Sequence, residues 1–428
     1  MTLTIDRRQM LAGMAATLAF SSIGLSRANA ATAMRLLWWG SKERSDRTFA
    51  AVKAYQAKNP DITIAGESFG WDSYWTRLAT QTGGGNAPDL IQMDYRYIFE
   101  YARRGALLDM TPYLGKSLKI EDFGQANIDS GKVDNKIYGV SLGVNSFMVV
   151  VNSAAWTEAG VEPPHDAMTW EQIGDACAKV TSAKKRRGFY GTGDASGNEP
   201  ALECWLRQRG KALYTTDGKL AFEAKDATEW FNLWGNMRKS GACVPADVQA
   251  LDQQTLETDM LVTKKAAMSF AHSNQFVAIQ GLSKEKLAIV SFPVAGADSK
   301  PGQYLKPSML MSVSATSANK DAAVAFVNYL VEDSEGAKTL GVERGIPPSP
   351  KIRDLLTPDL DATSKQVVDY IGRLTPHVGA LPPSPPNGAG ENALLLTKIA
   401  QEVAFGKTSA QDAGTKFTEQ AAANITRG

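Results

Sequence analysis

Short apolar runs alternate with amphipathic stretches between residues 34 and 104. Residues 34–39 form an apolar run that ends at Gly40, which is typical of a buried strand. Residues 46–58 follow with apolar side chains at helical spacing and stop before Pro60. The same alternation predicts strands over 62–65 and 89–94 and helices over 71–82 and 95–104. Strands that alternate with helices in this way predict an α/β fold with a mostly parallel sheet.

The remainder of the chain shows both patterns again. Residues 147–152 are the strongest apolar run, and residues 320–330 are amphipathic, with Ala323 and Phe326 on one helical face. The proline-rich segment 382–386 must be extended, and we interpret it as an internal loop. Weaker signals predict strands over 266–270 and 287–290 and helices over 170–182, 199–209, 227–240 and 391–404.

The N-terminal segment has the pattern of an export signal. Arg7 and Arg8 precede an apolar run, and an Ala-Asn-Ala cleavage sequence follows it. The apolar run is shorter than the roughly 20 residues that a membrane-spanning helix needs. The arginine pair resembles a twin-arginine signal, but Asp6 stands where such signals carry Ser or Thr, so Sec export stays open. We predict that residues 1–30 are an export signal peptide and that the mature chain begins near Ala31 in the periplasm.

Length and charge narrow the function classes. Without the predicted signal, 398 of the 428 residues remain, which is too many for one ordinary core and predicts two lobes. The signal's three arginines and one aspartate carry a charge of +2, so the net charge falls from +1 to −1. A nearly neutral chain binds polyanions poorly, which argues against nucleic acid as a partner. The strongest basic run, 184–187, is predicted as the solvated end of a helix.

Cysteine and histidine spacing does not indicate a metal centre or a cofactor. Cys177, Cys204 and Cys243 form no C-x-x-C motif, and both a Cys204–Cys243 disulfide and three buried thiols fit the sequence. The three histidines lie far apart and lack the spacing of zinc ligands. We therefore expect no cofactor and no structural metal.

Seven short motifs are spread along nearly the whole mature chain. They are the strand at 36–39 with its polar loop, then 55–62, 84–91, 137–140, 170–173, 314–320 and the Gly-Ile-Pro turn at 345–347. In this order and spacing they resemble the carbohydrate-binding subunits of bacterial ATP-binding-cassette importers, the maltose-binding-protein type. The best single match is Ser-Ala-Thr-Ser-Ala-Asn-Lys at 314–320, which runs into a predicted helix.

This resemblance implies a two-lobe periplasmic-binding-protein fold with several hinge crossings and a ligand cleft between the lobes. The first α/β lobe would hold residues 34–145 plus 305–345, and the second would hold 146–304 plus 346–428. The resemblance also implies a sugar ligand, permease subunits of an importer in the inner membrane as partners, and a monomer. Closure of the lobes around sugar would signal the permease.

Candidate ligand-binding residues follow from the chemistry of sugars. Sugars present hydroxyl rims and apolar faces, so a site combines aromatic rings with planar polar side chains, and ligands of open α/β sheets collect at the carboxyl ends of strands. Core packing is the alternative for each aromatic, and a helix cap or surface position for each polar residue. The predicted ligand-binding residues are Trp39, Ser41, Glu43, Arg44, Trp71, Tyr74, Asp94, Tyr95, Asn145, Asn198, Glu199, Trp205, His272, Asn274, Ser308 and Arg344.

An enzyme is the main alternative function. The G-x-S-x-G match at 139–143 lacks the strand before it and the helix after it that a hydrolase elbow needs. A periplasmic glycosidase would need two carboxylates, for which Asp94 and Glu199 are the candidates. A relative that binds a polyamine, a metal or a phosphate compound is a lesser alternative. Basic residues near the cleft leave acidic sugars open, and a neutral mono- to oligosaccharide is the default expectation.

Overall fold

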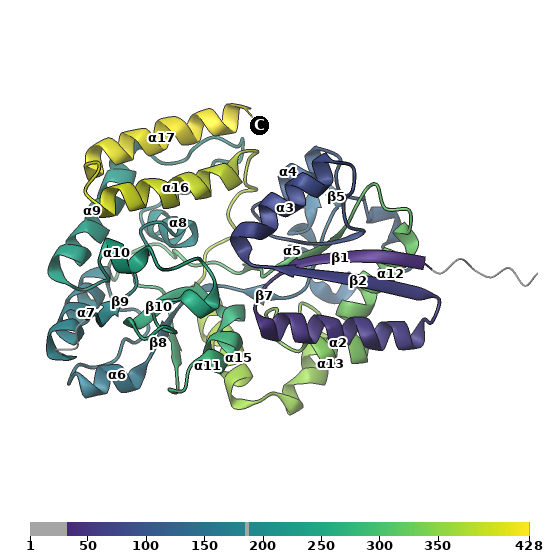
Figure 1. Ribbon diagram of the computed structural model, residues 1–428, viewed down its shortest axis with the longest axis horizontal. Coiled ribbons are helices and arrows are strands. Elements are labelled where there is room, and N and C mark those ends of the chain that lie inside the picture. The colour runs from purple at the N-terminus through teal and green to yellow at the C-terminus, as the bar shows by residue number, and fades with distance from the viewer. Residues whose placement is uncertain (1–31, 185–187, 428) are drawn as a thin grey trace, which may run out of the picture.

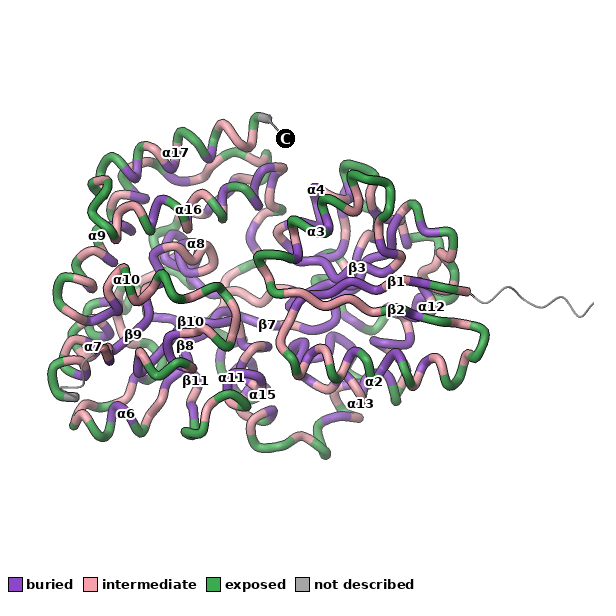
Figure 2. The backbone as a smooth tube through the Cα atoms, viewed as in Figure 1, coloured by how far each residue is buried: buried purple, intermediate pink, exposed green. Residues whose placement is uncertain are grey.

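The computed structural model describes residues 32–184 and 188–427, which fold around two separate sheets (Figure 1). The predicted export signal and residues 185–187 of the basic run lie outside the described residues. Within the described residues, no helix is both long enough and apolar enough to cross a bilayer. The central strands of both sheets are buried, while the outer helices expose one face (Figure 2).

The first sheet has the strand order β2-β1-β3-β13-β6. Its first three strands are parallel, as predicted, whereas β13 lies antiparallel to β3, with Leu310 opposite Met93. β3 and β13 are buried at every position because helices cover both faces of the sheet. The strands are β1 (Thr32–Trp39), β2 (Ile62–Phe69), β3 (Leu90–Met93), β6 (Val140–Ser141) and β13 (Leu310–Val313).

The helices of the first lobe begin at local capping signals. Helix α2 starts four residues before the predicted position because the Ser41 hydroxyl accepts a hydrogen bond from the Arg44 amide (3.3 Å) and caps the helix. The polar turn that follows Ser41 therefore becomes helical. The helices are α2 (Lys42–Lys58), α3 (Trp71–Gly83), α4 (Ile98–Arg103), α5 (Gln125–Asp129), α12 (Lys320–Glu332) and α13 (Ser334–Leu340), beside the hairpin of β4 (Lys132–Val133) and β5 (Lys136–Ile137).

The second sheet has the order β11-β8-β10-β9 and is not mostly parallel. The expectation of a mostly parallel sheet is wrong here, because β8 is antiparallel to both of its neighbours. Two consecutive parallel strands need a long crossover connection between them. The chain instead runs into β8 directly from the segment between the lobes. The strands are β8 (Phe147–Val151), β9 (Tyr190–Thr192), β10 (Ala266–His272) and β11 (Ala288–Val290).

Helices from two distant parts of the chain cover the second sheet. The C-terminal helix α17, which the sequence analysis did not predict, packs against α9 and buries Ala413, Phe417 and Ala421 at four-residue spacing. The helices are α6 (Ser153–Glu158), α7 (Trp170–Lys184), α8 (Glu199–Gln208), α9 (Ala224–Ser240), α10 (Ala246–Gln249), α11 (Phe276–Leu282), α15 (Ala362–Leu374), α16 (Ala389–Ala404) and α17 (Ala410–Arg427).

Three extended segments lie side by side between the two sheets. β7 (Val144–Asn145) pairs antiparallel with β12 (Lys306–Pro307), and Val144 also exchanges two backbone hydrogen bonds with Ile346. Gly345 has φ +101°, and a Cβ there would lie 2.7 Å from the Val144 carbonyl oxygen, so this crossing requires glycine. The chain thus passes between the lobes at three adjacent points.

The segment after the third crossing packs first on the first lobe. Helix α14 (Pro350–Leu356) contacts α13, and the Ser349 hydroxyl donates to the Asp122 carboxylate (2.6 Å). This segment was predicted to belong to the second lobe. Downstream, α15 packs against α11 and β11 of the second sheet. All three cysteines are buried free thiols, which decides between the two alternatives left open by the sequence.

Candidate ligand-binding cleft

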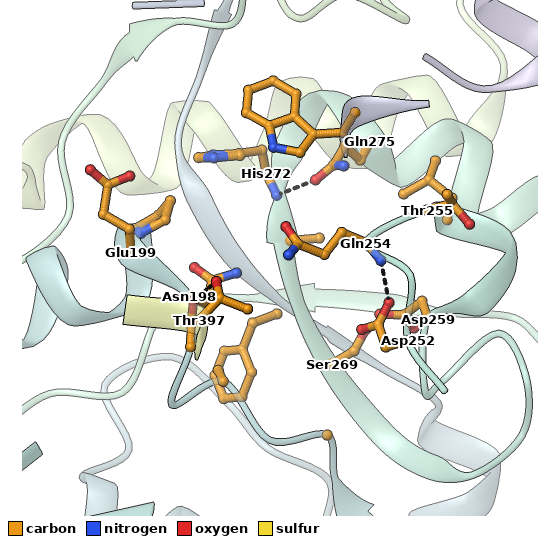
Figure 3. Close-up of a pocket in the computed structure, with 18 of the residues that line it drawn as sticks. Asn198, Glu199, Asp252, Gln254, Thr255, Asp259, Ser269, His272, Gln275 and Thr397 are labelled. Atoms are coloured by element: carbon orange, nitrogen blue, oxygen red, sulfur yellow. Dashed lines mark hydrogen bonds between the residues drawn. The ribbon is translucent and has the colours of Figure 1, made fainter. Parts of the chain in front are cut away.

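A cavity of about 590 Å³ lies between the two sheets. Its first-lobe wall comes from the ends of β1 and β3 and the start of α3, and its second-lobe wall from β10, the start of α8, α16 and the irregular segment 250–260. Figure 3 shows polar side chains from several of these second-lobe elements converging on the cavity. A volume of this size suits a small molecule of one to a few rings.

The first-lobe wall carries an aromatic cluster. The ring of Trp39 is surrounded by the rings of Trp71 (5.2 Å between centroids), Tyr74 and Trp75, and it is only 8% exposed. Trp75 in turn stacks on Tyr97 at 3.7 Å. Trp71 and Tyr97 line the cavity and are supported by this cluster, so they present fixed apolar surface to a ligand.

An ion pair joins the two lobes across the cleft. Arg96, which follows β3, pairs with Glu199 at the start of α8, and each side chain is 14% exposed. The neighbouring Asn198 caps α8 by accepting a hydrogen bond from the Ala201 amide (3.1 Å). Asn198 and Glu199 are therefore held at the cavity wall by the helix that they begin (Figure 3).

A buried charge cluster supports the loop after β1. Arg44 pairs with Glu343 at 2.9 Å, with side chains 5% and 1% exposed, and also donates to the Trp39 carbonyl (3.2 Å). Arg344 is buried behind it and donates to the Thr48 hydroxyl (2.7 Å), and burial lowers the pKa of its guanidinium to about 9. This cluster fixes the base of the cavity.

Two aspartates of the segment 250–260, Asp252 and Asp259, lie on the second-lobe wall (Figure 3). Burial first, and then the negative charge of Asp252, raise the pKa of Asp259 to about 6. Burial also raises the pKa of Asp252. Burial lowers the pKa of His272 well below its usual value, so the imidazole is neutral at pH 7, and its backbone amide donates to Gln275 Oε1 (2.8 Å).

The structure brings ten of the sixteen predicted residues to the cavity wall. Ligand contact by each of them stays a prediction. The ten are Trp39, Ser41, Arg44, Trp71, Asp94, Asn198, Glu199, His272, Asn274 and Ser308. The structure places the other six elsewhere, namely Glu43, Tyr74, Tyr95, Asn145, Trp205 and Arg344.

Three aromatics of that second group are part of the packing. The Tyr74 hydroxyl donates to the Gln92 carbonyl (2.5 Å) inside the first core, and Tyr95 packs its ring on Phe99. Trp205 is 2% exposed in the second core. Tyr74 and Trp205 lie in helices and Tyr95 in the turn before α4, and sequence spacing alone does not separate the buried face from the cleft face at these positions.

The three polar residues of the group have partners within the protein. Glu43 pairs with Arg47 at 3.0 Å on the surface of α2, which agrees with the alternative of a surface position. Asn145 donates to Asn274 Oδ1 at the crossing, and Arg344 belongs to the buried charge cluster described above. Glu43 and Arg344 are held away from the cavity by these partners, whereas Asn145 supports Asn274, which lines the cavity.

Most of the second-lobe wall was not predicted from the sequence. Asp252, Gln254, Thr255 and Asp259 lie in an irregular segment with no strand or helix pattern to place it. The polar run itself is visible in the sequence, but nothing local indicates that it faces the first lobe. Helix α16 was predicted, but not that Thr397 would line the cavity.

The enzyme motifs do not form a catalytic arrangement. Ser141 of the G-x-S-x-G match is 2% exposed in β6, and its hydroxyl donates to the Gly143 carbonyl (3.0 Å). Asp94 and Glu199 both line the cavity, but each already has a basic partner, Lys306 at 3.7 Å and Arg96 respectively. No group of three or more His, Cys, Asp or Glu among residues 32–184 and 188–427 is arranged to hold a metal ion.

Comparison with known proteins identifies the architecture. A family described as bacterial extracellular solute-binding protein matches residues 50–367. An extracellular solute-binding protein of family 1 from Alicyclobacillus acidocaldarius is 30% identical, with a TM-score of 0.65 over 93% of this chain and 99% of that one.

Two further solved structures share the fold at lower identity. An oligogalacturonide-binding protein from Yersinia enterocolitica is 20% identical with a TM-score of 0.83, and an ABC substrate-binding protein from Listeria monocytogenes, in complex with cycloalternan, is 21% identical with a TM-score of 0.80. Each comparison covers 92% of this chain and 99% of the other. The predicted two-lobe periplasmic-binding-protein fold is thereby confirmed.

Proposed function

The chain belongs to the bacterial extracellular solute-binding proteins, and from this membership we propose that it captures a sugar and delivers it to an ATP-binding-cassette importer. The proposed site of action is the periplasm, and the proposed partners are the permease subunits in the inner membrane. The protein would act as a monomer that binds its ligand and leaves it chemically unchanged.

The observation that carries this proposal is the composition of the cavity. Trp71 and Tyr97 offer apolar ring surface from the first lobe, while Asn198, Glu199 and His272 offer polar groups from the second. A sugar ring placed between them would stack one face on an aromatic ring and give its hydroxyls to the polar groups. Such a ligand contacts both lobes at once, so its binding energy favours their closure.

We further propose the lobe boundaries 34–145 plus 305–345 for the first lobe and 146–304 plus 346–428 for the second. The paired segments at Val144, Lys306 and Ile346 would act as the hinge, because they are the points where the chain passes between the two sheets. Residues 350–356 are the part of these boundaries to test first, because α14 packs on α13 of the first lobe although the boundaries assign it to the second.

Thermal unfolding against a sugar panel tests the proposal. The full chain would be melted with neutral, acidic and amino sugars from mono- to trisaccharides. A ligand at about 100 times its Kd should add about 2.7 kcal/mol to the free energy of unfolding and raise the Tm by a few degrees. The bound sugar would then be recovered, and its mass would be measured by mass spectrometry to tell intact from cleaved sugar. A flat response across the panel contradicts sugar binding, and recovery of cleaved sugar contradicts a purely binding role.

A further inference from the structure

The basic residues at the cavity are all neutralised by the protein itself. Arg44 pairs with Glu343, Arg96 with Glu199, and Lys306 with Asp94. A ligand carboxylate would have to compete with these pairs, and two of the three basic side chains are 11% or less exposed. The cationic side chains near the cavity therefore do not indicate an acidic sugar.

The acidic residues at the cavity are in excess. Besides the pairs just described, Asp194 pairs with Arg238, but three lining carboxylates, Asp252, Glu257 and Asp259, take part in no ion pair within the described chain. Asp72 of α3 acts electrostatically on Asp252 from the other lobe. Like charges face one another here, and closure of the lobes brings them together at a cost unless a positive charge enters.

The hydrogen-bond donors of the two aspartates are all uncharged. Asp259 Oδ1 accepts the backbone amides of Leu261 (2.8 Å) and Val262 (3.3 Å), so the loop holds this carboxylate through one oxygen. Asp252 Oδ1 accepts from the Gln254 amide (2.8 Å), as Figure 3 shows, and from the Thr258 hydroxyl (3.3 Å), while its Oδ2 accepts from the Gln249 side-chain amide (3.2 Å). Both carboxylates are thus positioned by uncharged donors rather than by a basic side chain.

An independent observation at the same place indicates an incomplete site. The Ser269 side chain lines the cavity beside Asp259 and Asp252 (Figure 3), and the residue is 3% exposed. Its hydroxyl lies close enough to Asp259 to lower the pKa of that carboxyl, but it makes no hydrogen bond of normal geometry within the described chain. Buried hydroxyls are normally satisfied, so a bound group is the natural partner for this one.

We propose that Asp252, Asp259 and Ser269 form a subsite for a protonated amine, and that the ligand class is amino sugars. The inference rests on the proposed sugar binding and narrows it. An ammonium group supplies three donors and one positive charge, which matches two carboxylates and one hydroxyl acceptor. A neutral hydroxyl could be bound by the same groups but would leave their charge uncompensated.

The test compares isosteric sugars that differ only by an amine. Glucosamine, galactosamine and mannosamine would be titrated calorimetrically into the full chain at pH 7, each beside its 2-hydroxyl counterpart, with galacturonic acid and spermidine added to the panel. We expect at least one amino sugar to bind ten times more tightly than its hydroxyl counterpart. This preference should shrink as the salt concentration rises, because it depends on charge.

Three variants assign the preference to the subsite. Asp252→Asn and Asp259→Asn should each weaken amino-sugar binding at least tenfold while changing the affinity for the hydroxyl counterpart by less than threefold, and Ser269→Ala should weaken it less. Asp298→Asn is the matched control, because Asp298 is an exposed second-lobe carboxylate outside the cavity. The melting curve of each unliganded variant verifies folding.

The outcomes separate this inference from the function on which it rests. Equal affinity for each isosteric pair, or tighter binding of galacturonic acid, overturns the amine subsite while sugar binding stands. Binding of spermidine without any sugar supports the amine subsite and contradicts the sugar proposal. No binding by any member of the panel contradicts both.

Discussion

At the residue scale, burial makes Asp259 a source of pH-dependent stability. Its pKa is raised to about 6, first by burial and then by the charge of Asp252, against an unfolded value of about 3.9, while Ser269 and two backbone amides lower it. Between pH 4 and 6 the folded state holds a proton that the unfolded state has lost, so stability falls as the pH rises through this window and is level above it.

We therefore expect Asp259→Asn to remove this pH dependence. The free energy of unfolding of the variant should exceed that of the original protein by almost nothing at pH 4 and by an amount on the order of 3 kcal/mol at pH 7. Urea unfolding at four pH values between 4 and 7 measures the difference. Parallel pH curves for the two proteins would contradict the raised pKa. The control Asp298→Asn, at an exposed residue outside the cavity, should give a curve parallel to that of the original protein.

Glu343 supports a second prediction at this scale. Its carboxylate is 1% exposed and pairs with Arg44, and Arg344 lies 3.9 Å away. Glu343→Gln leaves buried guanidinium charge uncompensated, so it should lower the free energy of unfolding by about 3–5 kcal/mol. Glu43→Gln is the control, because Glu43 and its partner Arg47 are each 34% exposed, and it should cost less than about 1 kcal/mol. Denaturant unfolding measures both variants. Equal losses in the free energy of unfolding would contradict a larger role for the buried Glu343.

These residues also show where sequence reasoning reaches its limit. Glu43 and Arg44 are neighbours, and both were predicted to lie in the cleft, with a helix cap or surface position as the alternative. In the structure Arg44 lies at the cavity base and Glu43 on the surface, because successive residues of a helix point about 100° apart. The deciding partner of Arg44 is Glu343, which lies 299 residues away in the sequence, so no local pattern could reveal it.

At the element scale, the parts of the fold that follow local rules were predictable. The strand at 34–39 and the helix at 71–82 agree with β1 and α3 because apolar periodicity and glycine stops determine them. Helix α17 was missed because its buried face is made of small alanines around one phenylalanine, which gives little apolar contrast. The antiparallel orientation of β13 depends on how the chain returns to the first sheet from the second lobe, and hydrophobic periodicity carries no information on that path.

The crossing at Gly345 gives a prediction for this scale. Gly345→Ala forces a side chain into a left-handed backbone and to within 2.7 Å of the Val144 carbonyl oxygen, so it should destabilise the protein by about 1–3 kcal/mol. Gly372→Ala is the matched control. Gly372 lies inside α15 with no atom within 4 Å of an added Cβ, so the substitution should stabilise by about 0.5–1 kcal/mol. Thermal unfolding of both variants measures these changes. A change in stability of the same sign for both variants would contradict the prediction.

At the scale of the whole molecule, the Arg96–Glu199 pair couples binding to lobe closure. It joins the end of a first-lobe strand to the start of a second-lobe helix, so its energy contributes only when the lobes are close. We expect each lobe to fold without the pair. Loss of the pair should therefore weaken the closed state and the binding of any ligand that requires closure, without unfolding either lobe.

We expect Arg96→Gln to raise the Kd of the sugar that gives the largest thermal shift by about tenfold, since a charged hydrogen bond contributes about 1.5–3 kcal/mol. The unliganded Tm should change by less than about 2 °C, and small-angle scattering of the unliganded variant should give a larger radius of gyration. Glu402→Gln breaks an ion pair between α16 and α17 inside one lobe, and it should leave the Kd unchanged. If Arg96→Gln binds as tightly as the original protein, the pair does not hold the lobes together. A large fall in its Tm would instead mean that the pair stabilises a single lobe, and closure would then have to depend on the ligand and the hinge segments alone.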